Sequence, residues 1–172
     1  MNGTPTLPFT LKRRSDVYSD SAITSTTETV HGLLMVGEGH LRIQWRVARK
    51  TDHVGSEIRS DEEMESVRQV DIPLDGVAGA VVRRRWWSWP PGARLILRAS
   101  DLRAFEELAG QEGLRLRHPA ELILPLRRRD RLAAEEFAAE LSLVLAERAV
   151  EKGRRPEALE EGETRKAVEG EG

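Results

Sequence analysis

Residues 81–92 concentrate the side chains of this chain that are best suited to making contacts. The stretch holds three consecutive arginines and three of the four tryptophans, followed by a Pro-Pro-Gly turn. Arg and Trp lead the residues that anchor binding surfaces, because they combine a large contact area with a cationic or hydrogen-bonding group. Alternation along a strand lets only a subset share one face, and we predict a contact surface there from Arg83, Arg85, Trp87 and Trp89.

A second interpretation of this stretch stays open. Tryptophan is highly buried on average, so Trp86 or Trp87 would pack in the core, Trp89 would stack on Pro90 or on an arginine, and the arginines would be solvated. In both interpretations the stretch forms a hairpin tip.

Patterns for catalysis or metal binding are missing from the sequence. The four histidines are dispersed and lack the spacing of metal ligands. There is no nucleophile elbow, no phosphate-binding loop of the GxxxxGK type and no cysteine to supply a thiolate. We therefore expect a protein that is not an enzyme, with no cofactor, no metal and no evident small-molecule substrate.

The charges nearly cancel over the whole chain but not locally. The formal net charge is -2 although 33% of the residues are charged, which argues against a dedicated nucleic-acid binder. Twelve arginines stand against six acidic residues between positions 81 and 131, whereas positions 57–65 are acidic. Contact between these two regions would allow a homo-oligomer, and the basic region would suit a protein partner or an anionic membrane surface.

Period-two alternation of apolar residues predicts about seven short antiparallel strands. They are residues 30–36, 40–48, 67–74, 77–86, 94–99, 114–117 and 121–126. Residues 101–109 are expected to form one short helix before the last strands. The acidic residues 50–65 are expected to be a solvated loop.

The strongest helix signal covers residues 131–149, where apolar side chains such as Phe137 and Leu141 recur at three-four spacing after the cap residue Asp130. This amphipathic helix is expected to close the core of the sheet. The predicted folded domain spans residues 29–150.

Both ends of the chain differ from this domain in composition. Residues 1–28 are rich in Ser and Thr, and we expect an extension that docks a short strand through Leu7, Phe9 and Leu11. Residues 151–172 are dominated by Gly, Pro, Glu, Lys and Arg, and we expect a disordered charged tail.

Three stretches, residues 32–41, 70–77 and 122–126, together with the order of hairpins and one closing helix, resemble bacterial pleckstrin-homology-like (PH-like) domains. The resemblance covers about residues 29–150. It implies a partly open barrel, or two near-orthogonal sheets, closed by the C-terminal helix and acting as a binding or assembly scaffold. Relatives that bind phosphoinositides use basic residues around the first hairpin loop. The loop at residues 37–39 is short and acidic here, so that ligand is not expected.

These observations predict a non-enzymatic interaction or scaffold module that binds a protein partner or self-associates through the Arg/Trp hairpin. The alternative is peripheral binding of that hairpin to anionic membrane lipid. No apolar run approaches the roughly 18 residues of a membrane-spanning helix. A cysteine-free chain suits the cytoplasm, so we expect a cytoplasmic location, with the membrane periphery as the alternative.

Overall fold

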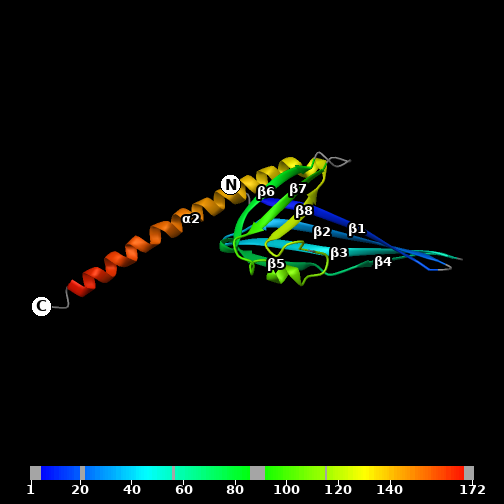
Figure 1. Cartoon of the computed structure of the whole chain (residues 1–172), viewed down its shortest axis with the longest axis horizontal. Coiled ribbons are helices and arrows are strands. Elements are labelled where there is room, and N and C mark those ends of the chain that lie inside the picture. Colours follow the sequence, from blue (N-terminus) through cyan, green and yellow to red (C-terminus); the bar gives the residue numbers. More distant parts are fainter. Residues whose placement is uncertain (1–4, 20–21, 56, 86–91, 115, 169–172) are drawn as a thin grey trace.

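The computed structural model describes residues 5–19, 22–55, 57–85, 92–114 and 116–168, without the side chains of Arg85 and of residues 154–168. Two antiparallel sheets and a long C-terminal helix make up this part of the chain (Figure 1). Sheet A contains β1 (Thr6–Tyr18), β2 (Ile23–Val36), β3 (His40–Val54), β4 (Ile58–Met64) and β5 (Arg68–Pro73). Sheet B contains β6 (Val77–Arg85), β7 (Gly92–Ala99) and β8 (Glu121–Leu126).

The predicted mainly β fold with a C-terminal helix is confirmed. The strand order is β1-β2-β3-β4 in sheet A, where β5 also pairs with β3, and β6-β7-β8 in sheet B. The two sheets do not close into a barrel, because no ladder joins β1 to β8 in the described residues. β1 and β8 are therefore free sheet edges that lie close to each other.

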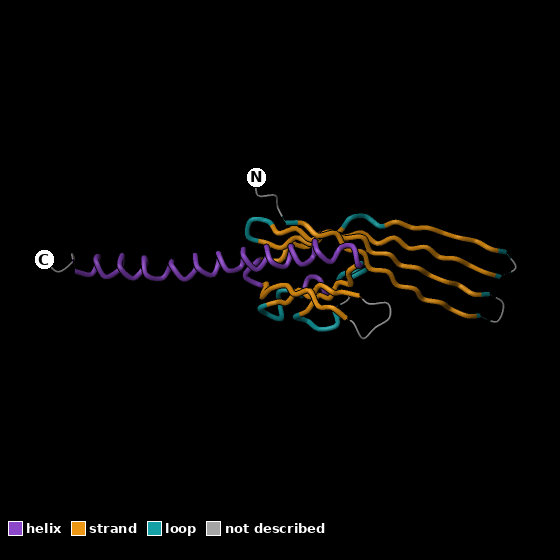
Figure 2. The backbone as a smooth tube through the Cα atoms, turned by 90° about the horizontal axis from the view of Figure 1, so that it is seen from above, coloured by secondary structure: helices purple, strands orange, loops and turns teal. Residues whose placement is uncertain are grey.

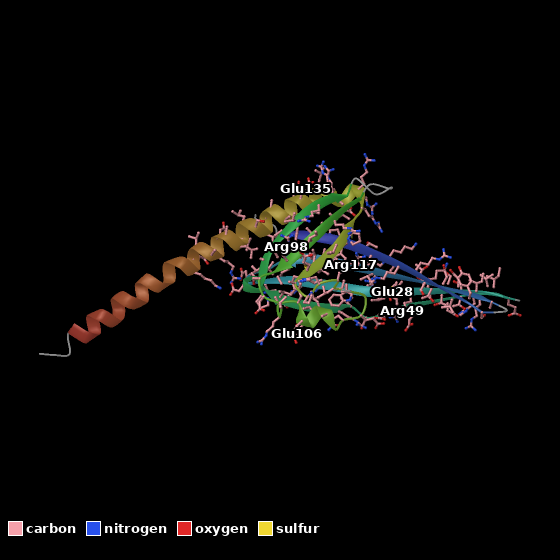
Figure 3. All side chains as sticks on the ribbon, in the orientation of Figure 1. Glu28, Arg49, Arg98, Glu106, Arg117 and Glu135 are labelled. Carbon is pink, nitrogen blue, oxygen red and sulfur yellow. The ribbon has the colours of Figure 1, made fainter. Side chains whose placement is uncertain are left out.

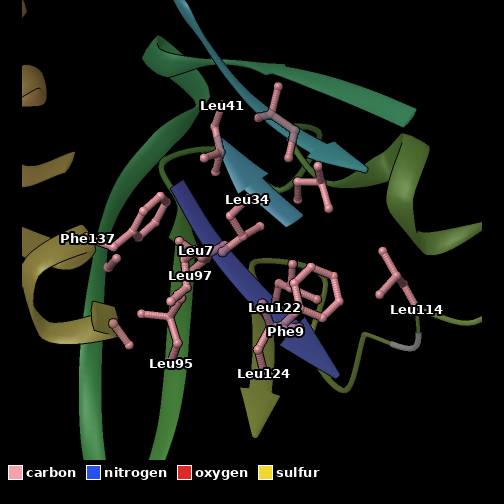
Figure 4. Close-up of a cluster of buried hydrophobic side chains, with 14 of the residues drawn as sticks. Leu7, Phe9, Leu34, Leu41, Leu95, Leu97, Leu114, Leu122, Leu124 and Phe137 are labelled. Carbon is pink, nitrogen blue, oxygen red and sulfur yellow. The ribbon is translucent and has the colours of Figure 1, made fainter. Parts of the chain in front are cut away.

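The core lies where sheet B and the first turns of the helix α2 (Arg131–Val168) cover one end of sheet A (Figure 4). Alternate residues of each strand point into it, as the period of two requires. Leu7, Leu34, Leu95, Leu97, Leu122 and Leu124 are almost completely buried there. Phe137 and Leu141 bring the apolar stripe of α2 onto the same cluster, which agrees with the predicted closing role of this helix.

The loop between β7 and β8 completes the core, and its described residues Leu114, Leu116 and Arg117 are not in the strand predicted at residues 114–117. Leu114 is buried from this loop, and Trp45 donates its indole N–H to the carbonyl oxygen of Glu112 at 3.0 Å. Gly113 adopts a φ of 89°, which favours glycine and lets the loop pass directly over β3. The helix predicted at residues 101–109 is shorter in the structure, α1 (Glu106–Ala109), and is preceded by turns.

Sheet A continues far beyond the core as a four-stranded extension, which we call the arm (residues 12–18, 23–29, 48–54 and 58–64). Figures 1 and 2 show the arm leaving the body on the side opposite to α2. Leu7, Phe9 and Leu11 are buried on β1, as expected of a docked strand, but β1 is longer than the short strand expected. The loop expected at residues 50–65 instead contains strand. β1 is a full edge strand that begins in the core, and residues 58–64 form β4.

A cluster of ion pairs marks the point where the core ends and the arm begins (Figure 3). Arg49 pairs with Glu65 at 2.9 Å, with Glu28 at 3.7 Å and with Glu112. Arg68 bridges to Glu65 and Glu112 at 2.9 and 3.2 Å. The face of sheet A that is apolar under sheet B therefore becomes charged as soon as the covering layer stops.

The charged C-terminal segment also differs from the expectation of disorder, because α2 continues to Val168. Its residues beyond position 150 are mostly Glu, Lys, Arg and Ala, which favour helix even without an apolar stripe. The helix nevertheless continues past Gly153, Pro156 and Gly162, three residues that oppose helix in its interior.

Candidate functional site: a basic groove between the sheet edges

The predicted contact residues fall at the end of the β6–β7 hairpin. Trp87 and Trp89 lie outside the described residues. Arg85 is the last residue of β6, and only its backbone is described. Arg83 is exposed on β6, so this one member of the predicted surface is placed by its side chain.

Arg83 lies directly opposite Arg94 of β7, on the face of sheet B that points away from the core. The next partner across the sheet is Pro125 of β8. Like charges placed opposite each other in an antiparallel pair are unfavourable. No carboxylate lies within ion-pair distance of either arginine in the described part of the chain, so this pair creates a local positive field.

Neighbouring arginines of the same hairpin behave differently. Arg84 points to the opposite face, as alternation requires, and approaches Glu135 of α2 at 3.9 Å. Arg98 pairs with Glu121 of β8 at 3.3 Å. These two arginines approach acidic partners within the chain, whereas Arg83 and Arg94 of the same hairpin have no acidic partner among the described residues.

A groove of about 490 Å³ runs between the edges of β1 and β8, next to Arg94. Four cationic side chains line it and none of its lining residues is acidic: Lys12, Arg13, Arg94 and Arg117. Apolar side chains form its other walls: Leu11, Leu116, Leu122, Ile123 and Pro125. Figure 3 shows Arg117 on the loop beside β8. An anionic group flanked by apolar side chains fits this lining by charge and by polarity.

One of the four cations is partly neutralised. Arg13 donates a hydrogen bond to Glu28 of β2 at 3.2 Å. No carboxylate of the described residues pairs with Lys12, Arg94 or Arg117. The remaining positive charge is therefore carried by side chains from β1, β7 and the loop before β8.

The backbone of both strands also faces the groove. At the two ends of the β1–β2 ladder, Ser19 N–H bonds to Ala22 C=O and Val36 N–H bonds to Pro5 C=O, so the odd-numbered residues of β1 bond to β2. The backbone N–H and C=O of the even-numbered Lys12 therefore point away from β2. The bond from Ala99 N–H to Ala120 C=O fixes the parity of the β7–β8 ladder in the same way and leaves the polar groups of Ile123 pointing outward. An extended segment placed in the groove could pair with the edge of β1. β8 offers an outward N–H only at Ile123, because Pro125 has none and the Glu121 N–H bonds to the His118 carbonyl oxygen.

Sequence reasoning pointed to Arg83, which lies opposite Arg94 but does not line the groove, and it missed Lys12, Arg13, Arg94 and Arg117 as a group. Their proximity depends on β1 lying beside β8, two strands that are more than a hundred residues apart in the chain. The available signal was the alternation of Leu7, Phe9 and Leu11. This alternation indicated a strand but not its neighbour.

Comparison with known proteins adds no relative: no family model, no curated protein and no solved structure matches this chain. Within the described residues, no group of three His, Cys, Asp or Glu side chains is arranged to hold a metal ion. No helix in the same part of the chain is long and apolar enough to cross a membrane.

Proposed function

We propose that this chain is a non-enzymatic interaction module that binds an acidic, extended segment of a protein partner in the groove between β1 and β8. The observation that carries the proposal is the convergence of Lys12, Arg94 and Arg117 beside apolar walls and unpaired strand edges. Strand addition would supply main-chain hydrogen bonds, and the cations would select acidic side chains.

A PH-like architecture is part of this proposal. The succession of antiparallel hairpins and one closing helix supports it, as do the stretches quoted from the sequence. In this assignment the arm is an elaboration of the first strands, and the module serves as a scaffold that presents one groove to a partner.

The test is a binding titration with a labelled ten-residue peptide of alternating Glu and Val, compared with the same peptide in which Lys replaces Glu. We expect the full chain to bind the acidic peptide and not the basic one, and the affinity to fall as ionic strength rises. Arg94→Glu and Arg117→Glu should each raise the Kd at least about tenfold, because they place like charges against the ligand.

The matched control is Arg103→Glu, an equivalent charge reversal at an exposed arginine outside the groove. It should leave the Kd within about twofold. Phosphatidylserine vesicles form a second arm of the experiment. Binding to vesicles without binding to the peptide would replace the protein-partner proposal by the membrane alternative, and binding to neither probe would refute a function of the groove in recognising anions.

A further inference from the structure

The arm carries a second interaction surface, independent of the groove at Arg94 and Arg117. Its four strands lie beyond the cover of sheet B and α2 (Figure 2), and β4 is exposed at every residue. Polar cross-strand contacts hold the arm together. The Ser60 hydroxyl donates to Asp52 at 2.7 Å and lowers the pKa of that carboxyl, and Thr24 bonds to His53 at 3.1 Å.

Both edges of the arm are open for pairing. Residues 12–18 of β1 and 58–64 of β4 contain no proline, and their ladders show no register shift. Native sheets usually protect their edges with such interruptions, or with charged side chains that repel a second edge. The arm has charged edges, but the two edges differ in sign.

The β1 edge is basic and the β4 edge is acidic. Residues 12–18 carry Lys12, Arg13 and Arg14 against one carboxylate, a net charge of +2. Residues 58–64 carry three carboxylates against Arg59, a net charge of -2. Two β1 edges or two β4 edges would repel each other, whereas β1 of one copy and β4 of another attract.

We propose that the arm joins copies of this chain head to tail, with β1 of one copy pairing antiparallel with β4 of the next, so that successive arms form one continuous sheet. In this proposal the acidic residues 57–65 of one copy contact β1 of another copy. From the sequence we had expected them to contact the basic region at residues 81–131 instead. It does not depend on the proposed role of the groove.

Each row of side chains across the arm would continue into the next copy in the same register. One row reads Arg13, Glu28, Arg49 and Glu63 from β1 to β4, so the Arg13 of the next copy would extend an alternation of charge. The row that contains Arg14 ends at Glu62. In all seven rows, the β4 residue of one copy and the β1 residue of the next copy avoid a pair of like charges.

Hydrogen-bonding parity allows the same register. Glu65 N–H bonds to Val47 C=O, so the odd-numbered residues of β4 bond to β3 and the polar groups of Ser60 and Glu62 point outward. By the same reasoning, the backbone N–H and C=O groups of the even-numbered residues of β1, including Arg14, point away from β2. Arg14 opposite Glu62 would thus form a directly hydrogen-bonded pair.

The tip of the arm adds an apolar contact. Tyr18, Ile23, Val54 and Ile58 form one row across the four strands, exposed by 73%, 42%, 47% and 83%. The two outermost members are the most exposed, and head-to-tail pairing would bring Ile58 beside Tyr18 of the next copy. Aromatic and β-branched side chains form favourable cross-strand pairs.

Strand twist separates the bodies of neighbouring copies. Adjacent strands rotate by roughly 20–25°, so a four-stranded arm would turn the next copy by roughly 80–100°. The bodies would then point in different directions around a shared ribbon of arms. This contact is heterologous, so it generates a ring or a filament rather than a closed dimer.

The charge test uses Arg14→Glu and Glu62→Lys in the full chain, with mass measured by sedimentation over a concentration series at low and high salt. The unmodified chain should gain mass with concentration, less so at high salt. Each variant alone should need at least about tenfold more protein to assemble, because its contact now joins like charges. An equimolar mixture should recover assembly, since the introduced lysine of one variant meets the introduced glutamate of the other while the unmodified edges still match.

A second pair of variants tests the backbone contact without changing charge. Ser60→Pro removes an outward N–H and should weaken assembly, whereas Ser60→Ala loses the same hydroxyl, keeps the N–H and should assemble like the unmodified chain. The proposal is overturned if the unmodified chain stays monomeric throughout, if the mixture fails to recover assembly, or if Ser60→Pro assembles normally.

Discussion

Replacing Phe137 with alanine is expected to lower the free energy of unfolding by about 3–5 kcal/mol. Phe137 is 2% exposed and is the largest side chain that α2 places in the core (Figure 4). Its removal would leave a cavity between the helix and both sheets, because Leu7 and Leu97 are fixed by their strands and cannot collapse into the space. Chemical denaturation of the full chain measures this change.

Leu143→Ala is the matched control for Phe137→Ala. Leu143 lies on the same helix but is 60% exposed, so its truncation should change the free energy of unfolding by no more than about 0.5 kcal/mol. Equal effects of the two substitutions would contradict the assignment of the buried face of α2.

Replacing Gly32 with alanine should lower the free energy of unfolding by about 1–3 kcal/mol through overpacking. Gly32 lies on β2 between Phe9 and Trp45 in one cross-strand row. A Cβ atom at this position would overlap the ring of Phe9, so the ring must leave its place in the core. The glycine is needed here for space and not for an unusual backbone angle, since its φ is not positive.

Gly110→Ala provides the comparison for Gly32→Ala. No atom lies within 4 Å of the Cβ position at Gly110, and its φ of -87° suits alanine. We expect a change of less than about 1 kcal/mol, with stabilisation favoured by the lower entropy of the unfolded chain. A larger loss at Gly110 than at Gly32 would show that Phe9 does not occupy the position described.

The sequence was informative wherever one face of an element is buried. The strand predicted at residues 40–48 is present, and the alternating apolar residues Leu41, Ile43, Trp45 and Val47 on one of its faces are all buried. The spacing around Phe137 likewise predicted the packed face of α2. In these segments the hydrophobic effect produces the periodicity from which the prediction was made.

The arm could not be predicted from that signal, because neither of its faces is covered. Residues 50–65 alternate between polar residues on both sides of the sheet, so they resembled a solvated loop. The β-branched residues between positions 23 and 30, including Thr24 and Thr26, were the remaining indication of strand. Pairing with β3 in a hairpin, from Val54 opposite Ile58 to Ala48 opposite Met64, gives β4 its extended conformation although neither face is apolar.

The candidate site was predictable only in part, for the same reason. The arginine excess after position 81 indicated a basic surface, and Arg83 is exposed there. Which arginines remain available depends on their neighbours across the sheets: Arg84 and Arg98 approach acidic partners, whereas Arg94 meets Lys12 from the edge of β1. Such convergence is a property of the packing of the two sheets and leaves no local pattern in the sequence.

Hydrogen–deuterium exchange of the full chain, with and without the Glu-Val peptide, tests the role of the groove most directly. We predict slower exchange of the outward-facing amides of Ile123 in β8 or Lys12 in β1 when the peptide is bound, with no change at the tip of the arm and with loss of the effect in Arg117→Glu. Protection confined to the arm, or unchanged exchange at both groove edges under saturating peptide, would contradict the assignment of this groove as the partner-binding site.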